Sequence, residues 1–171
     1  VMLLPVMGYF IAQPKDVWQF PTDNYGYILI TFFSYANFVL IGYLKDTEAD
    51  MATNYKTFPV VLGWDKTVLT GDIIALITLL LFWQQIEINA WSLAFGLAGS
   101  IVMVAGQISA HRTREKNERG AMLPIASTVR GFILLHIAIT LHFQPDWYAY
   151  ALIYYSLFEW ALYRRPSKYQ I

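Results

Sequence analysis

Five long apolar segments occupy most of this chain and constrain its fold more than any other feature. They contain few polar residues, and they lie at residues 25–44, 67–83, 90–110, 122–142 and 147–163. Near-continuous apolar runs that approach 20 residues are typical of helices that cross a bilayer. We therefore expect an all-α fold, a polytopic membrane helix bundle whose surroundings are a lipid bilayer.

The composition agrees with a membrane protein. Charged residues make up 14% of the chain and hydrophobic residues 57%, whereas a soluble domain carries about a quarter charged residues. The chain has no cysteine, which excludes disulfides and thiolate metal sites. No segment has the composition of a separate soluble domain, so we treat residues 1–171 as one membrane domain and expect no nucleic-acid partner.

A shorter apolar segment, residues 1–12, precedes the five. It falls well short of the roughly 20 residues that a spanning helix needs, and it lacks the basic start and cleavage site of a signal peptide. We interpret it as part of a helix, the first of six helical segments. We accordingly expect the chain to be an N-terminally truncated fragment.

The basic residues are segregated when the loops are assigned alternately to two sides. One side holds eleven of the twelve, and the other holds only Lys15. The eleven are Lys45, Lys56, Lys66, Arg112, Arg114, Lys116, Arg119, Arg130, Arg164, Arg165 and Lys168. Such an excess marks the cytoplasmic side of a multi-pass membrane protein. The loop of residues 45–66 is therefore expected to be cytoplasmic.

That loop carries the residues with the clearest chemistry. Asp46 and Asp50 stand four residues apart, so on a helical turn both point from one face. Carboxylate oxygens suit Mg²⁺, which shares its coordination readily with substrate phosphates. Lys45 and Lys56 offer positive charges for phosphate oxygens. A magnesium-bound diphosphate would fit this combination, although a solvated loop of mixed charge explains the charge pattern equally well.

Three further polar residues are candidates for substrate binding. Asn37 lies about two turns inside the preceding apolar segment, where an amide needs a partner, and Tyr43 adds a hydroxyl near its end. Arg130 contacts the diphosphate, pairs with Asp72 across the apolar region or extends its charged end to the membrane surface, and the last two are favoured over the first. Glu159 is expected to balance the arginines that follow it, and the six tryptophans are expected to lie at the membrane interfaces.

The amino-acid sequence of residues 45–63 resembles the second aspartate-rich motif of the UbiA-type intramembrane prenyltransferases. The matching residues are Lys45, Asp46 and Asp50, then Lys56-Thr57-Phe58-Pro59-Val60-Val61-Leu62-Gly63, in which Phe58 replaces the commoner leucine. The resemblance implies an all-helical fold of nine spans with two aspartate-rich motifs, which together hold Mg²⁺ and a prenyl diphosphate. It assigns Asp46 and Asp50 to the metal, and Asp46, Asp50 and Lys56 to catalysis.

The resemblance also implies a reaction, in which a prenyl group is transferred to an acceptor. The expected acceptor is an aromatic ring of lipid-quinone biosynthesis. The first motif of the family, N-x-x-x-D-x-x-x-D, is absent from the chain. We therefore expect a missing N-terminal half of the same protein to complete the site, and this fragment alone to be inactive.

Two other classes of membrane protein are alternatives to the prenyltransferases. The CDP-alcohol phosphotransferases also use aspartates at a membrane helix end, but their D-G-x-x-A-R core does not occur here. A non-catalytic transport or structural subunit is the alternative function. Charged residues near the bilayer midplane would favour it, whereas the charged residues of this chain gather at the segment ends.

Overall fold

The computed structural model describes residues 7, 24–87 and 89–164, and within them the chain is helical, without strands. The elements are α2 (Tyr25–Ala52), α3 (Phe58–Leu62), α4 (Trp64–Gln85), α5 (Ala90–Arg112), α6 (Glu118–Phe143), the 3₁₀ turn η2 (Pro145–Trp147) and α7 (Tyr148–Arg164). The predicted segment 1–12 lies outside the described residues.

Four of these helices, α2, α4, α5 and α6, are long and apolar enough to cross a membrane. They have 22 to 28 residues, whereas α7 has 17. The expected all-α fold with membrane-length helices is thus confirmed. The structure differs from the prediction at the end of α2, which continues to Ala52, about two turns beyond residue 44.

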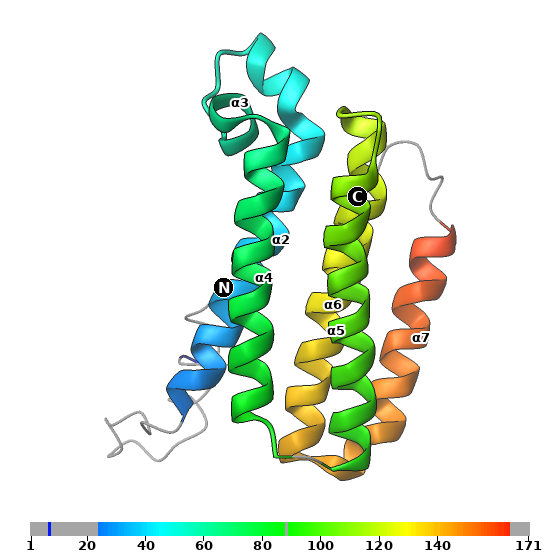
Figure 1. The fold of residues 1–171 in the computed structure, drawn as a ribbon. Coiled ribbons are helices and arrows are strands. Elements are labelled where there is room, and N and C mark those ends of the chain that lie inside the picture. Colours follow the sequence, from blue (N-terminus) through cyan, green and yellow to red (C-terminus); the bar gives the residue numbers. More distant parts are fainter. Residues whose placement is uncertain (1–6, 8–23, 88, 165–171) are drawn as a thin grey trace.

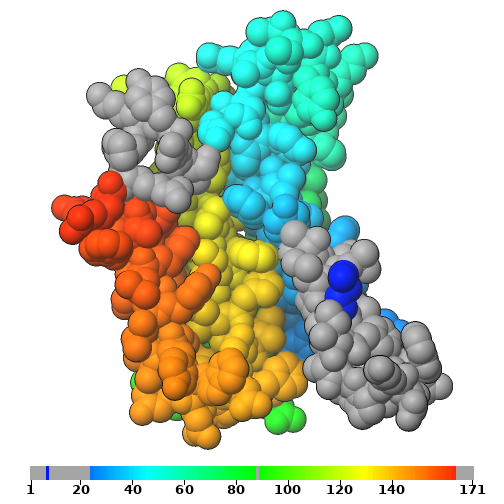
Figure 2. Space-filling model, turned by 180° about the vertical axis from the view of Figure 1, so that it is seen from behind, coloured from blue at the N-terminus to red at the C-terminus, as the bar shows by residue number. Residues whose placement is uncertain are grey.

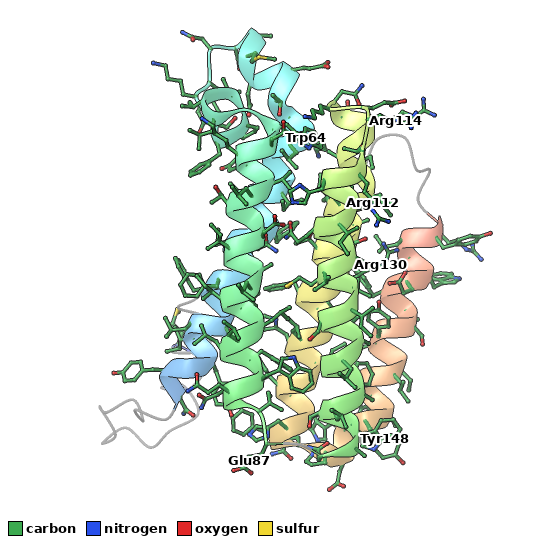
Figure 3. The ribbon with its side chains drawn as sticks, viewed as in Figure 1. Trp64, Glu87, Arg112, Arg114, Arg130 and Tyr148 are labelled. Carbon is green, nitrogen blue, oxygen red and sulfur yellow. The ribbon has the colours of Figure 1, made fainter. Side chains whose placement is uncertain are left out.

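The long helices run alternately up and down (Figure 1). α2 and α4 lie side by side, and α5 and α6 form a second pair. α7 lies beside α6, to which it is joined by the contact between Glu159 and Arg130. Seen from behind, α6 occupies the middle of the molecule between α7 and α2 (Figure 2). Consequently the connections from α2 to α4 and from α5 to α6 share one end of the bundle. Glu87 and Tyr148 lie at the opposite end, away from Trp64 and Arg114 (Figure 3).

Glycines allow α5 and α6 to pack closely. A Cβ atom added at Gly131 of α6 would lie 2.9 Å from the Cβ of Met103 and 3.1 Å from its backbone nitrogen. On α5, a Cβ at Gly99 would lie 3.0 Å from the backbone nitrogen of Leu135, and one at Gly106 would be 3.0 Å from the Cβ of Ser127. Small residues at such positions let two helix backbones approach within van der Waals contact.

The packed helices enclose two apolar clusters. One, near the η2 end, includes Phe82, Phe95, Met103, Leu135 and Leu141. The other, near the α3 end, includes Ile41, Leu44, Trp64, Val68, Ala110 and Ile125. Because both clusters draw on several helices, each helix contributes only a strip of its surface to the interior. The remaining strips expose large apolar side chains, as a lipid environment permits.

Polar contacts join α4 to α5 near the α3 end. Trp64 Nε1 donates to the carbonyl oxygen of Ala110 at 3.1 Å, and only 8% of Trp64 is exposed. His111 Nε2 and Asp72 Oδ2 lie 2.6 Å apart. Trp64 is the first residue of α4, so it lies at a helix end as expected, but its side chain packs inside the bundle. An indole N–H needs an acceptor when it is buried, and the carbonyl near the end of α5 supplies one.

We predict that Gly131→Ala destabilises the protein by about 1 to 3 kcal/mol, because the added methyl group meets backbone atoms of Met103 that cannot move aside. Gly42→Ala is the matched control, since it is also helical and a Cβ there meets nothing within 4 Å. Unfolding of both variants in detergent micelles would measure the difference. Equal stability of the two variants would contradict the close packing of α5 and α6.

Candidate active site

The two candidate metal ligands lie on the last two turns of α2. Residues 45–52 belong to this helix, so Asp46 and Asp50 are held by helical hydrogen bonds and are not part of a loop. Both side chains are half-buried, and they lie one turn apart on the same face. Tyr43 shares that face, three residues before Asp46. The predicted pairing of the two carboxylates on one helix face is confirmed by this geometry.

The chain after α2 folds back onto Asp50. The backbone nitrogen of Tyr55 donates to the carbonyl oxygen of Asp50 at 2.8 Å, and Thr57 Oγ1 donates to Asp50 Oδ2 at 2.8 Å. Asn54, at φ 58°, lies in the left-handed region that lets the chain reverse here. Thr57 is 6% exposed. The hydroxyl therefore fixes the orientation of one carboxylate while the other oxygen of Asp50 stays available.

Thr57 is a functional candidate to which sequence analysis assigned no role. It lies within the K-T-F-P segment that carries the resemblance, but no pattern in the sequence links its hydroxyl to Asp50. The link depends on the turn between them. Pro59 in the first turn of α3, and Gly63, at φ 80° between α3 and α4, complete this reversal.

The two candidate lysines flank the carboxylates in different ways. Lys56 precedes Thr57 in the turn, and it is exposed and makes no ion pair with any described residue. Lys45 is half-buried on α2 beside Asp46. Lys56 thus has its charge available next to the Asp50–Thr57 contact, which is where the binding of phosphate oxygens was expected.

Asn37 lies in the core, away from the carboxylates. Its side chain is fully buried, and its Oδ1 accepts a hydrogen bond from Gln107 Nε2 at 3.0 Å. Asp46 lies nine residues further along α2, about half a turn around the helix axis and about 13 Å along it. The structure therefore does not bring Asn37 together with Asp46 and Asp50, and its role in substrate binding stays a prediction.

Gln107 is the partner that an amide in an apolar helix requires, and it was not singled out from the sequence. Gly71 of α4 leaves the space in which the two amides meet, because a Cβ there would lie 3.2 Å from Asn37 Oδ1 and 3.3 Å from Gln107 Oε1. The signal was present, since Gln107 is the one amide in the apolar segment 90–110. The contact links α2 to α5 across α4.

Arg130 faces α7. Its Nε and Nη2 donate to the two carboxylate oxygens of Glu159 at 2.7 and 2.9 Å, and Tyr155 donates to Glu159 at 2.8 Å. The favoured pairing of Arg130 with Asp72 is wrong, because Asp72 contacts His111. The expectation for Glu159 is wrong as well, since its carboxylate is engaged by Arg130. A contact of Arg130 with substrate stays a prediction.

The donor atoms at the end of α2 fit a hard divalent cation in part. Asp46 and Asp50 supply carboxylate oxygens, and one oxygen of Asp50 also accepts the hydrogen bond from Thr57. Within residues 24–87 and 89–164, no group of three or more acidic, histidine or cysteine side chains is placed to hold a metal. An octahedral Mg²⁺ would thus need most of its ligands from water, substrate phosphates or residues beyond those described.

Comparison of the chain with protein-family models, with curated proteins and with solved structures finds no match.

We predict that Thr57→Val lowers the free energy of unfolding by about 1 to 2 kcal/mol, because it removes a hydrogen bond to a carboxylate. Valine has nearly the same shape as threonine, so the packing is kept. Thr47→Val is the control, since the hydroxyl of Thr47 bonds only to backbone carbonyls within α2. Chemical denaturation in micelles would compare the two variants. The same small loss in both would show that the Asp50 contact contributes nothing specific.

Proposed function

We propose that this chain is part of an integral membrane enzyme, a UbiA-like prenyltransferase. In the proposed reaction a prenyl group passes from a prenyl diphosphate to an acceptor, an aromatic ring in lipid-quinone biosynthesis, with Mg²⁺ as cofactor. One observation carries the proposal. The carboxylates Asp46 and Asp50 share one face at the end of a membrane-length helix, and Thr57 holds one of them in place.

The position of the pair suits an amphiphilic substrate. A diphosphate head is charged and belongs at the membrane surface, whereas an isoprenoid tail belongs in the apolar region. Aromatic side chains lie on α2 and α6 below the carboxylates. Tyr35 contacts Phe38 and Phe132, with ring centroids 5.8 and 6.2 Å apart, and Phe132 in turn lies 4.2 Å from the ring of His136. These rings form a wall along which a prenyl tail can extend.

In the proposed chemistry the diphosphate is the leaving group of the prenyl chain. The bond between the first prenyl carbon and its oxygen breaks, and the electron pair leaves with the diphosphate. The acceptor ring carbon forms the new carbon–carbon bond and releases its proton to water. Bound Mg²⁺ would neutralise charge that develops on the leaving group. Asp46 and Asp50 hold and orient that complex, and Lys56 contacts the diphosphate oxygens.

The distribution of charge supports a cytoplasmic position for residues 45–66. The connections from α2 to α4 and from α5 to α6 lie at one end of the bundle. They carry Lys56, Arg114 and Lys116, and Arg119 follows in the first turn of α6. Asp146 lies in η2, on the connection at the opposite end. An excess of basic residues in short loops marks the cytoplasmic face. We therefore place the carboxylates at the cytoplasmic mouth of the bundle.

The orientation of α2 supports a second contribution to the site. Asp46 lies roughly opposite the helix face on which Asn37 packs toward α4 and α5, so the carboxylates face away from that part of the bundle. We place the remaining ligands of the ion in an upstream half of the same protein. On this proposal the 171-residue chain alone is inactive.

We predict that Asp46→Asn and Asp50→Asn in the full-length protein each reduce Mg²⁺-dependent prenyl transfer by at least about 100-fold, because each removes a charge that binds the metal–diphosphate complex. Glu48→Gln is the matched control, an exposed carboxylate on the same turn that points from another face. Labelled prenyl diphosphates and a panel of aromatic acceptors, added to membranes that contain the protein, give the measurement.

Two results would count against the proposal. Near-normal turnover in both aspartate variants would remove Asp46 and Asp50 from the site. If wild-type membranes formed no Mg²⁺-dependent product with any acceptor, a non-catalytic transport or structural role would be the better interpretation.

A further inference from the structure

A groove lies between the end of α5 and the start of α6, apart from the candidate active site. Its volume is about 610 Å³. Ala105, Ile108, Leu123 and Pro124 form an apolar floor, and Arg112 and Arg119 stand at the basic end. No residue of α2 or α3 lines it, so it shares no side chain with Asp46, Asp50 or Thr57. The groove therefore needs an explanation independent of the proposed transfer reaction.

The two arginines have positive charge available for a ligand. Both are exposed, and neither makes a salt bridge with a described residue. Neighbouring cations behave differently. Lys116 Nζ lies 2.7 Å from each carboxylate oxygen of Asp65, and His111 contacts Asp72. The α4 carboxylates Asp65 and Asp72 thus contact other partners. Within the described residues no salt bridge joins either groove arginine to a carboxylate, Glu115 and Glu118 included.

The floor adds a second, independent feature. Leu123 is 64% exposed and Ile108 44% exposed, and both lie about one turn deeper along their helices than the arginines, on the side of the membrane-length segments. A small soluble anion would use the arginines alone and would leave these side chains uncovered. A ligand that covers both regions has an anionic head and an apolar tail.

We propose that this groove binds an anionic phospholipid, with its phosphate between Arg112 and Arg119 and an acyl chain on the floor. A guanidinium group can donate two parallel hydrogen bonds to the oxygens of one phosphate. Basic pockets between membrane helices are suited to anionic headgroups. The first turn of α6, which carries the carboxylate of Glu118 as well as Arg119, lies beside the groove, and the helix dipole there favours negative charge. The lipid would join the ends of α5 and α6 at the membrane surface.

Native mass spectrometry of the full chain in detergent micelles tests the proposal directly. Phosphatidylglycerol and phosphatidylcholine with identical acyl chains are added, and the bound lipids are counted. We expect one phosphatidylglycerol to bind at least about ten-fold more tightly than phosphatidylcholine. The double variant Arg112→Gln/Arg119→Gln is expected to lose that preference. The absence of any preference in the wild type would overturn the proposal.

A second double variant controls for total charge. Lys66→Gln/Arg114→Gln removes the same charge from the same end of the bundle, but neither residue lines the groove. It is expected to retain the preference for phosphatidylglycerol. An equal loss in both double variants would show only a general attraction of anionic lipid to the basic end, and would overturn the assigned site. Circular dichroism of each variant confirms that the helices persist.

The apolar floor has its own test. Leu123→Asn keeps both arginines, so we expect it to weaken phosphatidylglycerol binding, while inorganic phosphate at millimolar concentration fails to displace the lipid from the wild type. Displacement by phosphate, together with unchanged lipid binding in Leu123→Asn, would instead define a site for free phosphate and would overturn the lipid assignment.

Discussion

The close contact between α5 and α6 determines where the other described helices lie. Gly99, Gly106 and Gly131 bring the two backbones together without intervening side chains. α2 packs against α6 on one side, and α7 lies on the other side, joined to α6 through Arg130 and Glu159 (Figure 2). α4 joins the assembly between α2 and α5 through Trp64 and Asp72. A change in the spacing of α5 and α6 would therefore reach every other helix of the bundle.

Polar contacts within this apolar bundle fix the rotation of each helix about its own axis. Apolar packing alone tolerates small rotations, because one aliphatic surface resembles another. The hydrogen bond from Gln107 to Asn37 fixes one face of α2 toward α5, and the bidentate contact of Arg130 with Glu159 does the same for α7. Since α2 is continuous, the contact at Asn37 also sets the direction in which Asp46 and Asp50 point.

The helices could be predicted from the sequence because hydrocarbon thickness dictates their length and composition. The shared face of Asp46 and Asp50 followed from helical spacing alone. Helical spacing could not predict the partners of Asn37, Asp72 and Arg130, because each partner lies on another helix. The two members of a pair are 70, 39 and 29 residues apart in the sequence, respectively. The apolar segment predicted a helix that ends at residue 44. α2 is longer because its last two turns are polar, and a polar helical turn does not extend an apolar run.

Because α2 continues past its apolar part, the carboxylates lie on a rigid extension of a helix that is long and apolar enough to cross a membrane. Their height above the bilayer is then set by how the apolar portion of α2 matches the hydrocarbon thickness, and a helix answers mismatch by tilting. In a thinner bilayer a greater tilt lowers Asp46 and Asp50 toward the lipid headgroups and displaces them sideways. The position of the candidate site would then depend on the thickness of the host membrane.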